Sequence, residues 1–478
     1  MSSATCDLAI IGAGPAGMAA AAAASECGLS TVVLDEQAEP GGQIYRGIER
    51  LAATRPLHLQ WLGSDYAAGL ELTRAFRLAK VDYLDSAQVW QVEPPQPEGR
   101  VFYRRNGAVG ILSAKKVLIA PGAMERPMPV PGWTLPGVLT CGAAQTLLKS
   151  HGLVPDTRRG RVVLAGCGPL LLLLAAQLTR AGVKPAALLE TSVNRWAALP
   201  HLPGFLASPG YAGKGLALLR ELKAAGVTMH KGVTRLALHG DTQVREIEFD
   251  CNGETLREPA AVVLLHQGVV PNGNLAWSLN LEHAWDDRQR CFQPVLDAWG
   301  RSSVTGILVA GDAGGIVGAK GAEAMGRIAA LAAALDLGKL TAGACDERAR
   351  DARATLARQR AARPFLDVLY RPAQHWVAPA DAETIVCRCE EIRAGEIRQL
   401  VTVQHCPGPN QMKSFVRCGM GPCQGRLCGL TVVEMIAECR GIPVRDVGYY
   451  RIRPPVKPVT MGDLAEMDVA MRNDAVGL

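Results

Sequence analysis

Residues 8–17 read Leu8-Ala9-Ile10-Ile11-Gly12-Ala13-Gly14-Pro15-Ala16-Gly17, a short apolar run followed by three glycines within six residues. The four apolar residues predict a short buried strand, and the alanine-rich stretch after the glycines predicts a helix to about residue 27. Residues 31–34 predict a second strand, which ends at Asp35 and Glu36. A strand, a glycine turn, a helix and a strand that ends in an acid together form a dinucleotide-binding βαβ unit.

The chemistry of this unit follows from its glycines, which let the backbone approach a pyrophosphate at the N-terminus of the helix. The acid after the second strand accepts a hydrogen bond from a ribose hydroxyl, and its spacing favours Asp35 with Glu36 as the alternative. A glycine turn that merely caps a helix is the competing interpretation, which the complete βαβ context disfavours. The residues predicted to hold the dinucleotide are Gly12, Gly14, Pro15, Ala16, Gly17, Asp35 and Glu36.

A second βαβ unit follows in the middle of the chain, with a strand at residues 161–165 and a helix at residues 170–181. Its turn places Leu171 where the fingerprint needs a glycine for close packing of helix on strand. No tight cluster of arginines follows to hold a 2′-phosphate, so we expect NAD(P) not to bind and the unit to be vestigial or to hold another nucleotide. Residues 227–263 alternate in polarity around two turns and predict a small antiparallel insertion.

Cysteines gather in the last third of the chain. Cys387 and Cys389 lie one residue apart, and Cys418, Cys423 and Cys428 follow in a glycine-rich stretch. Four thiolates that converge on one point suit an iron–sulfur cluster or Zn²⁺, although two cysteines one residue apart are tight for a tetrahedral zinc clip. Reduced thiols without a ligand are the alternative, which the clustering disfavours.

The bulk composition excludes several classes. With 478 residues, 48% of them hydrophobic and 20% charged, the chain is long enough for about three domains and is not of a disordered or fibrous class. The net charge of +6 is spread along the chain, so we expect no nucleic-acid partner. The start shows no signal peptide and the apolar runs are shorter than the ~20 residues of a membrane helix, so we expect a soluble cytoplasmic chain.

A disulfide reductase is also excluded. The stretch Gly42-Gln43-Ile44-Tyr45 contains no cysteine, and Cys141 and Cys167 are single. A single cysteine cannot form the disulfide that a flavin would reduce to a dithiol, because it has no second thiol beside it. His266 and Gln267 precede a sheet crossing from which they could reach a flavin, but a lone histidine is more often structural.

Several later segments resemble the glutathione-reductase-like superfamily. They are the loop Gly41-Gly42-Gln43, the strand before Pro121-Gly122, the turn at residues 268–272, and Gly311-Asp312-Ala313 after a strand. The resemblance implies FAD, with the aspartate on the ribityl chain. It adds as cofactor-binding residues Gly41, Gly42, Gln43, Gly122, Gly311 and Asp312.

The cysteine spacing resembles that of bacterioferritin-associated-ferredoxin-like [2Fe–2S] domains. That resemblance implies Cys387, Cys389, Cys423 and Cys428 as the ligands, with Cys418 as the alternative for the third place. Over its whole length the chain resembles the α (A) subunit of heteromeric FAD-dependent amine dehydrogenases, the group of opine oxidases, D-hydroxyproline and proline dehydrogenases and hydrogen cyanide synthase. Leu171 fits this family, whose second unit often lacks the third glycine.

The family resemblance implies a function. A β subunit, which is a flavoprotein of the D-amino-acid-oxidase type, would oxidise an amine to an imine, and some members also have a small ferredoxin-like γ subunit. This chain would carry electrons through FAD and the cluster towards a quinone or other carrier. It would need no acid or base catalyst of its own. The complex would lie in the cytoplasm or at the surface of the inner membrane. The first alternative is a single-chain NAD(P)H-dependent flavin and iron–sulfur reductase, and the second is a scaffold that keeps FAD only for structure.

The expected fold is therefore α/β, a glutathione-reductase-like protein with two dinucleotide-binding domains and a small helical [2Fe–2S] domain. We expect the FAD domain at residues 1–125 and 275–335, the second Rossmann-like domain at 126–274 and a helical linker at 336–380. The [2Fe–2S] domain would cover residues 381–442, and an extended tail would cover residues 443–478.

Overall fold

The computed structural model describes residues 5–193, 195–206 and 208–467. Its first sheet has seven strands in the order β3-β2-β1-β6-β5-β4, with β19 also pairing with β6. The long strand β6 pairs in parallel with β1 and β19 near its end and antiparallel with β5 near its start. The strands are β1 (Thr5–Ile11), β2 (Thr31–Leu34), β3 (Asp82–Leu84), β4 (Gln88–Glu93), β5 (Gly99–Arg105), β6 (Ala108–Ile119) and β19 (Ile307–Val309).

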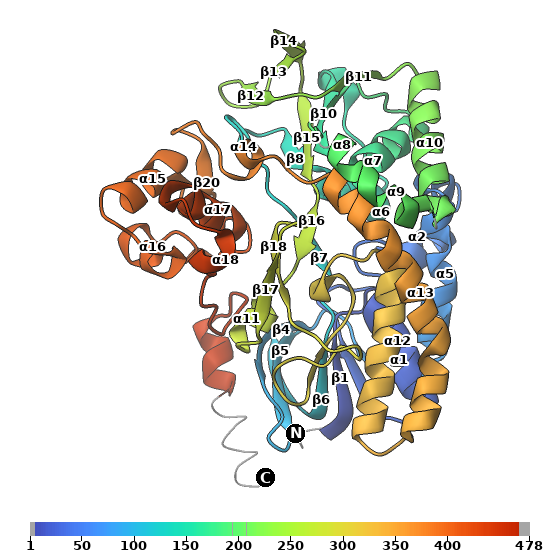
Figure 1. Cartoon of the computed structure of the whole chain (residues 1–478). Coiled ribbons are helices and arrows are strands. Elements are labelled where there is room, and N and C mark those ends of the chain that lie inside the picture. Colours follow the sequence, from blue (N-terminus) through green and yellow to red (C-terminus); the bar gives the residue numbers. More distant parts are fainter. Residues whose placement is uncertain (1–4, 194, 207, 468–478) are drawn as a thin grey trace.

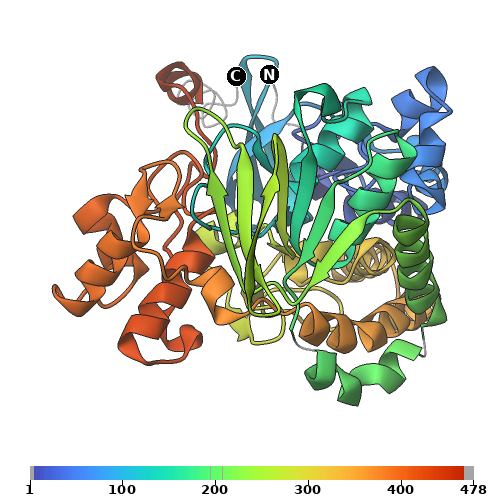
Figure 2. The same ribbon diagram turned by 90° about the horizontal axis from the view of Figure 1, so that it is seen from above.

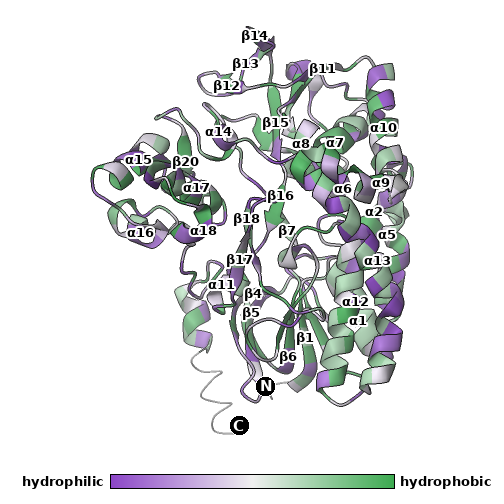
Figure 3. Cartoon of the chain, in the orientation of Figure 1, coloured by the Kyte–Doolittle hydropathy of each residue, from purple (hydrophilic) through white to green (hydrophobic). Residues whose placement is uncertain are grey.

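Two helices, α1 (Pro15–Glu26) and α12 (Ala319–Asp336), cover one face of this sheet, and α13 (Ala342–Leu369) packs on α12. They lie side by side in Figure 1, and Figure 3 shows that α1 and α12 are largely hydrophobic whereas α13 carries many hydrophilic residues. The helix α1 is alanine-rich and buried for most of its length, because it packs against the sheet, α12 and α5. Between β2 and β3 the chain forms α2 (Ile48–Thr54), α3 (His58–Leu62), α4 (Ser64–Ala67) and α5 (Gly69–Leu78).

Glycines set the close packing of α1. A Cβ on Gly17 would lie 1.8 Å from the carbonyl oxygen of Gly12, and a Cβ on Gly326 would lie 1.9 Å from that of Ala16. Both contacts are with backbone, so a side chain at either position could be accommodated only by moving a helix. These glycines bring α12 and the start of α1 together at the carboxyl edge of the sheet.

The second sheet is fully parallel, in the order β11-β10-β9-β15-β8. Its strands are β8 (Val138–Thr140), β9 (Val162–Cys167), β10 (Ala187–Glu190), β11 (Thr228–Lys231) and β15 (Val262–Gln267). The helices around it are α6 (Cys141–His151), η1 (Thr157–Arg159), α7 (Pro169–Arg180), α8 (Arg195–Ala198), η2 (Leu199–His201), α9 (Leu202–Leu206) and α10 (Pro209–Ala224). The predicted antiparallel insertion is confirmed as β12 (Arg235–His239), β13 (Glu246–Cys251) and β14 (Glu254–Pro259).

The two sheets are joined by a pair of short antiparallel strands, β7 (Ala123–Glu125) and β16 (Val269–Pro271). The chain crosses from the first sheet to the second through β7 and returns through β16. After the return it forms α11 (Asn274–Ser278), the hairpin β17 (His283–Asp286) and β18 (Cys291–Pro294), and η3 (Gly311–Gly314).

The C-terminal part begins with α14 (Gln374–Val377) and continues into residues 381–442, called here the cysteine domain. It contains β20 (Ile385–Cys387), β21 (Ile392–Arg393), α15 (Ala394–Thr402), α16 (Pro409–Val416) and α17 (Gly429–Arg440). Figure 2 shows it beside the sheets, on the side away from α2–α5. One hydrophobic core runs from β1, β4, β5 and α11 into this domain without interruption.

The following residues 443–467, called here the tail, start with α18 (Val444–Val447) and then run along the first sheet to Thr460. The short helix departs from the expected fully extended course of this segment, and residues 468–478 of the predicted tail lie outside the described residues. Among the described helices, none is both long and apolar enough to cross a bilayer.

A buried ion pair fastens the cysteine domain to the hairpin of β17 and β18. Arg290 donates to both carboxylate oxygens of Glu434 at 2.9 and 2.6 Å, and the two side chains are only 8% and 1% exposed. We expect Glu434→Ala to lower the free energy of unfolding by about 3–5 kcal/mol, because it leaves a buried guanidinium without its counter-charge.

Urea unfolding followed by circular dichroism measures this effect. Glu383→Ala is the matched control, because Glu383 pairs with Arg393 at an exposed position and such pairs contribute less than about 1 kcal/mol. Equal small losses for both variants would contradict a fastening role for the buried pair.

Candidate functional site

A cavity of about 600 Å³ opens at the carboxyl edge of the first sheet, between the glycine turn before α1 and the start of α12. This volume lies within the range of about 300–1,000 Å³ that is usual for cofactor sites. Every residue predicted to bind the dinucleotide lines it except Gly17 and Gly41, which support it from behind. The lining members are Gly12, Gly14, Pro15, Ala16, Asp35, Glu36, Gly42, Gln43, Gly122, Gly311 and Asp312.

The floor of the cavity is bare backbone. Gly12 has φ +105°, and a Cβ there would lie 2.4 Å from the carbonyl oxygen of Ala120. A Cβ on Gly42 would lie 2.8 Å from the Cα of Gly14, so the loop after β2 rests directly on the glycine turn. The amide of Gly41 holds this loop by donating to the carbonyl oxygen of Ala13 at 2.8 Å. A charged ligand can therefore reach the backbone amides at the N-terminus of α1.

The two acids after β2 have different surroundings. Asp35 is buried, and its carboxylate accepts hydrogen bonds from the amides of Ala13 at 2.9 Å and Gln37 at 3.0 Å. Burial raises the pKa of Asp35 to about 6. Glu36 is half exposed and pairs with Lys457 of the tail. Asp35 is thus held in the turn through both of its oxygens, each of which can still accept a further hydrogen bond, and Glu36 lies at the more exposed rim.

Asp312 lies at the opposite wall, just before α12. One of its oxygens accepts from the amides of Val317 at 2.8 Å and Gly318 at 3.0 Å. Burial raises the pKa of Asp312 above its usual value. The hydrogen bonds fix the carboxyl group at the cavity wall, at the place where the resemblance puts the ribityl chain.

A buried lysine supports the loop that contains Gly42 and Gln43. Lys149 is 3% exposed and donates to the carbonyl oxygen of Gln43 at 3.0 Å and to the side chain of Gln145 at 2.8 Å. Burial lowers the pKa of Lys149 to about 7, and the charge of Arg46 adds to this effect. No sequence pattern points to Lys149, because it lies in a helix far along the chain from the loop that it supports.

The structure also brings together a carboxylate and a histidine at the junction of the two sheets. Glu125 lines the cavity, and its oxygens lie 2.5 Å from Nδ1 of His266 and 2.7 Å from the amide of Gly142. The ring of His266, which from its place in the sequence could reach a flavin, is buried behind Glu125. Sequence reasoning missed Glu125. Its position in the sequence could have indicated it, because Glu125 lies in β7, which pairs with β16, and β16 begins shortly after His266.

The turn of the second βαβ unit differs from the glycine turn of the first. Leu171 is buried in the core of the second sheet, as expected of a leucine that replaces the packing glycine. A Cβ on Gly168 would meet the ring of His266 at 3.2 Å. The carbonyl oxygen of Tyr370, from the end of α13, lies 3.3 Å from Sγ of Cys167. The turn is thus occupied by the protein's own groups on two sides.

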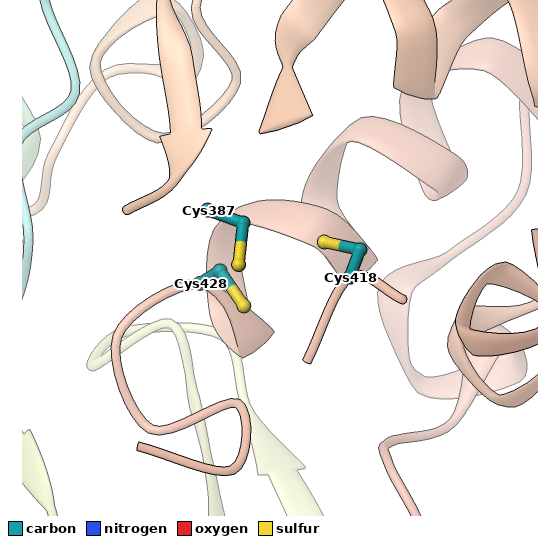
Figure 4. A group of neighbouring side chains, drawn as sticks. All are labelled: Cys387, Cys418 and Cys428. Atoms are coloured by element: carbon teal, nitrogen blue, oxygen red, sulfur yellow. The ribbon is translucent and has the colours of Figure 1, made fainter. Parts of the chain in front are cut away.

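The cysteine domain brings three thiols together. The Sγ atoms of Cys387, Cys418 and Cys428 lie within 4.8 Å of one another, and Figure 4 shows the three side chains pointing toward one another. Hydrogen bonds from Cys418 and Cys428 lower the pKa of the Cys387 thiol. A first thiolate is therefore stabilised at this position, and thiolates are the form that binds metal.

The other two cysteines form a second contact. The thiols of Cys389 and Cys423 are hydrogen-bonded to each other, and burial raises the pKa of Cys389. Gly421 makes this possible, because a Cβ there would lie 2.2 Å from the Cβ of Cys389. Cys387 thus lies beside both Cys418 and Cys428, and Cys389 lies beside Cys423. Two groups of thiols can supply the two irons of a [2Fe–2S] cluster, and the five cysteines are one more than the four ligands that such a cluster needs.

The cysteine domain reaches the cavity. Arg426, between Cys423 and Cys428, lines it together with Val456 and Lys457 of the tail. The side chain of Asn274, another lining residue, donates to the carbonyl oxygen of Gln424 at 3.2 Å. The loop between Cys423 and Cys428, called here the cysteine loop, is therefore next to the dinucleotide cavity in the folded chain.

Comparison with known proteins agrees with this architecture. A family model described as pyridine nucleotide-disulphide oxidoreductase matches residues 6–334, and one described as sarcosine oxidase A3 domain matches residues 397–467. The A subunit of opine oxidase from Rhizobium meliloti is 47% identical over 96% of this chain and 87% of its own length. The HcnB subunit of hydrogen cyanide synthase from Pseudomonas aeruginosa is 32% identical over 94% of this chain and 96% of its own.

Solved structures share the fold. L-proline dehydrogenase from P. horikoshii superposes with a TM-score of 0.72 at 18% identity, over 97% of this chain and 80% of that chain. Thioredoxin reductase from T. acidophilum gives 0.51 at 22% identity, over 70% of this chain and 99% of that chain. These matches confirm the predicted α/β fold class.

Single cysteine variants test the ligand set. We expect Cys387→Ser, Cys389→Ser, Cys423→Ser and Cys428→Ser each to lose most of the bound iron, because each removes one thiolate from an iron. Cys418→Ser should keep it, as should Cys406→Ser, whose buried thiol lies outside the group. Iron and acid-labile sulfide per chain are the measurement. Loss of iron in Cys418→Ser with retention in Cys423→Ser would instead make Cys418 the third ligand.

The buried lysine predicts a pH dependence of stability. Because the pKa of Lys149 falls from 10.5 to about 7 in the folded chain, the unfolded chain binds more protons between these values. Its contribution to the free energy of unfolding therefore rises with pH, by up to about 1.4 kcal/mol per pH unit. Lys149→Met should remove this rise between about pH 7.5 and 9.5 in urea unfolding. The exposed Lys339→Met is the control, and a variant profile parallel to that of the wild type would contradict the assignment.

Proposed function

The chain belongs to the family of the opine oxidase A subunits, and from this we propose that it is the electron-transfer subunit of a heteromeric amine dehydrogenase. In this proposal it holds FAD and a [2Fe–2S] cluster, and a partner subunit oxidises the amine to an imine. The substrate is an opine, D-hydroxyproline, proline or a related secondary amine. When bound, FAD supplies two-electron chemistry and the cluster supplies one-electron chemistry.

The observation that carries the proposal is the meeting of the dinucleotide cavity and the cysteine loop. Arg426 is both a wall of the cavity and a member of the short loop between two of the predicted ligands. FAD in the cavity and a cluster on the cysteines would then be separated by little more than the loop that contains Arg426. No acid or base of this chain is needed for electron transfer between them.

The lining of the cavity supports FAD as the dinucleotide. Asp312 and the start of α12 lie across the cavity from the glycine turn, which is the arrangement that the resemblance assigns to the ribityl chain and the flavin. We assign the ribose contact to the acids after β2, Asp35 with Glu36 as the alternative, because both line the cavity. Lys149 holds the loop of Gln43 on the flavin side.

Partners and location follow from the same premise. We propose a flavoprotein β subunit of the D-amino-acid-oxidase type as the partner that oxidises the amine, together with a further, ferredoxin-like γ subunit. The support is that relatives at 47% and 32% identity carry subunit names. We propose a cytoplasmic complex, peripheral at the inner membrane where a quinone is the acceptor.

The alternative is a self-contained NAD(P)H reductase, and the second βαβ unit speaks against it. Leu171 fills the packing position, His266 faces Gly168, and the carbonyl oxygen of Tyr370 lies against Cys167. These groups leave little room for a second pyrophosphate at the turn. Electrons would therefore have to enter from a partner.

An anaerobic visible spectrum tests the proposal directly. The purified chain should show flavin and cluster bands that dithionite bleaches and that neither NADH nor NADPH bleaches. Addition of the partner subunit with an opine or a D-imino acid should then bleach both. Prompt bleaching by NADH or NADPH alone would make the chain a reductase in its own right.

A further inference from the structure

The outer wall of the dinucleotide cavity comes from the last part of the chain. The glycine turn, the acids and the start of α12 form the inner walls, whereas Arg426, Val456 and Lys457 close the outside. Arg426 belongs to the cysteine domain and the other two residues belong to the tail. The dinucleotide-binding fold alone therefore does not complete its own site.

The tail is held in place by the loop between Cys423 and Cys428. The side chain of Gln424 donates to the carbonyl oxygen of Pro455 at 2.6 Å, and the guanidinium of Arg426 donates to that of Val456 at 3.3 Å. Earlier in the tail, the ring of Tyr450 packs where Cβ atoms on Gly419 and Gly425 would lie, at 2.5 and 2.7 Å. The position of the tail thus depends on the conformation of the cysteine loop.

The same segments are fastened to the first sheet on the other side. The amide of Val456 donates to the carbonyl oxygen of Trp90 in β4 at 2.8 Å. The ammonium of Lys457 pairs with Glu36 at the end of β2. The side chain of Asn274 donates to the carbonyl oxygen of Gln424. A continuous set of contacts therefore runs from the cysteines through the tail to the acid beside the glycine turn.

Charge gives this wall a role in binding. Arg426 and Lys457 place a guanidinium and an ammonium at the rim of a cavity that would take a dinucleotide with a doubly negative pyrophosphate, and the ammonium pairs there with Glu36. Charges within about 8 Å of each other interact through physiological salt, more so at a partly enclosed site. Lys457 is only 22% exposed, and its ammonium offsets the charge of Glu36 at the cavity rim, which lowers the repulsion between that carboxylate and a bound pyrophosphate.

We propose that Arg426 and Lys457 are dinucleotide-binding residues, and that binding of the dinucleotide is thermodynamically coupled to assembly of the cysteine cluster through the loop and tail that carry them. The proposal rests on the proposed function, since FAD and an iron–sulfur cluster are the two ligands. Coupling of this kind is reciprocal, so that each ligand raises the affinity for the other by the same factor.

The test measures FAD binding itself, by the change of flavin fluorescence on titration of the deflavinated chain. We expect Lys457→Ala and Arg426→Met each to raise the Kd of FAD about tenfold, and Lys457→Arg to restore it. Anaerobic removal of iron from the wild type with a chelator should raise the Kd about tenfold as well, within the 5–150-fold range of typical couplings. In Lys457→Ala the further effect of iron removal should shrink to about twofold.

The matched control is Arg453→Ala, which removes an exposed positive charge from the same tail outside the cavity lining and should leave the Kd within about twofold. Circular dichroism melting of each deflavinated protein separates loss of binding from loss of folding. Failure of FAD to bind the wild type would overturn the proposed cofactor, and this inference with it. Normal binding of FAD with a Kd unmoved by iron removal and by Lys457→Ala would overturn this inference and leave the proposed cofactor in place.

Discussion

The approach of two helices to bare backbone is the constraint on which the rest of the structure depends. The helix α1 lies on the turn at Gly12 because Gly17 has no side chain, and α12 lies on α1 because Gly326 has none. These are contacts between main-chain atoms, which no rotamer change can relieve. Their consequence is that the starts of α1 and α12, from distant parts of the chain, border one cavity, with Asp312 on the wall across from the glycine turn.

The second βαβ unit has the same topology without this constraint, and the outcome differs. Leu171 takes the place of the packing glycine and joins the core of the second sheet. The turn is then covered by the end of α13 and by His266, which in turn holds Glu125 at the cavity. The second βαβ unit, which has the topology of a nucleotide site, thus holds a side chain of the neighbouring cavity in place.

Sequence reasoning identified features that depend on short spacings. The glycine turn, the acids, the motif around Asp312 and the antiparallel insertion are all local patterns, and the structure places them as such patterns require. What it missed are groups brought together by the fold: Lys149 under the Gln43 loop, Glu125 with His266, and Lys457 with Glu36. Two side chains that are separated by a hundred or more residues and meet only in the fold produce no periodic pattern in the sequence. The choice between Cys418 and Cys423 has the same origin, because spacing alone does not tell which thiols face each other.

The unbroken hydrophobic core between the first sheet and the cysteine domain bears on the order of assembly. Buried residues of β4, β5 and α11 belong to the same connected hydrophobic cluster as those of α15 and α17, so the core of the cysteine domain is continuous with that of the first sheet. During synthesis the N-terminal residues emerge first and can form their sheet before the cysteines leave the ribosome. The cysteine domain then finishes folding against a surface that already exists. The isolated C-terminal fragment would accordingly expose apolar residues that the first sheet covers in the full chain.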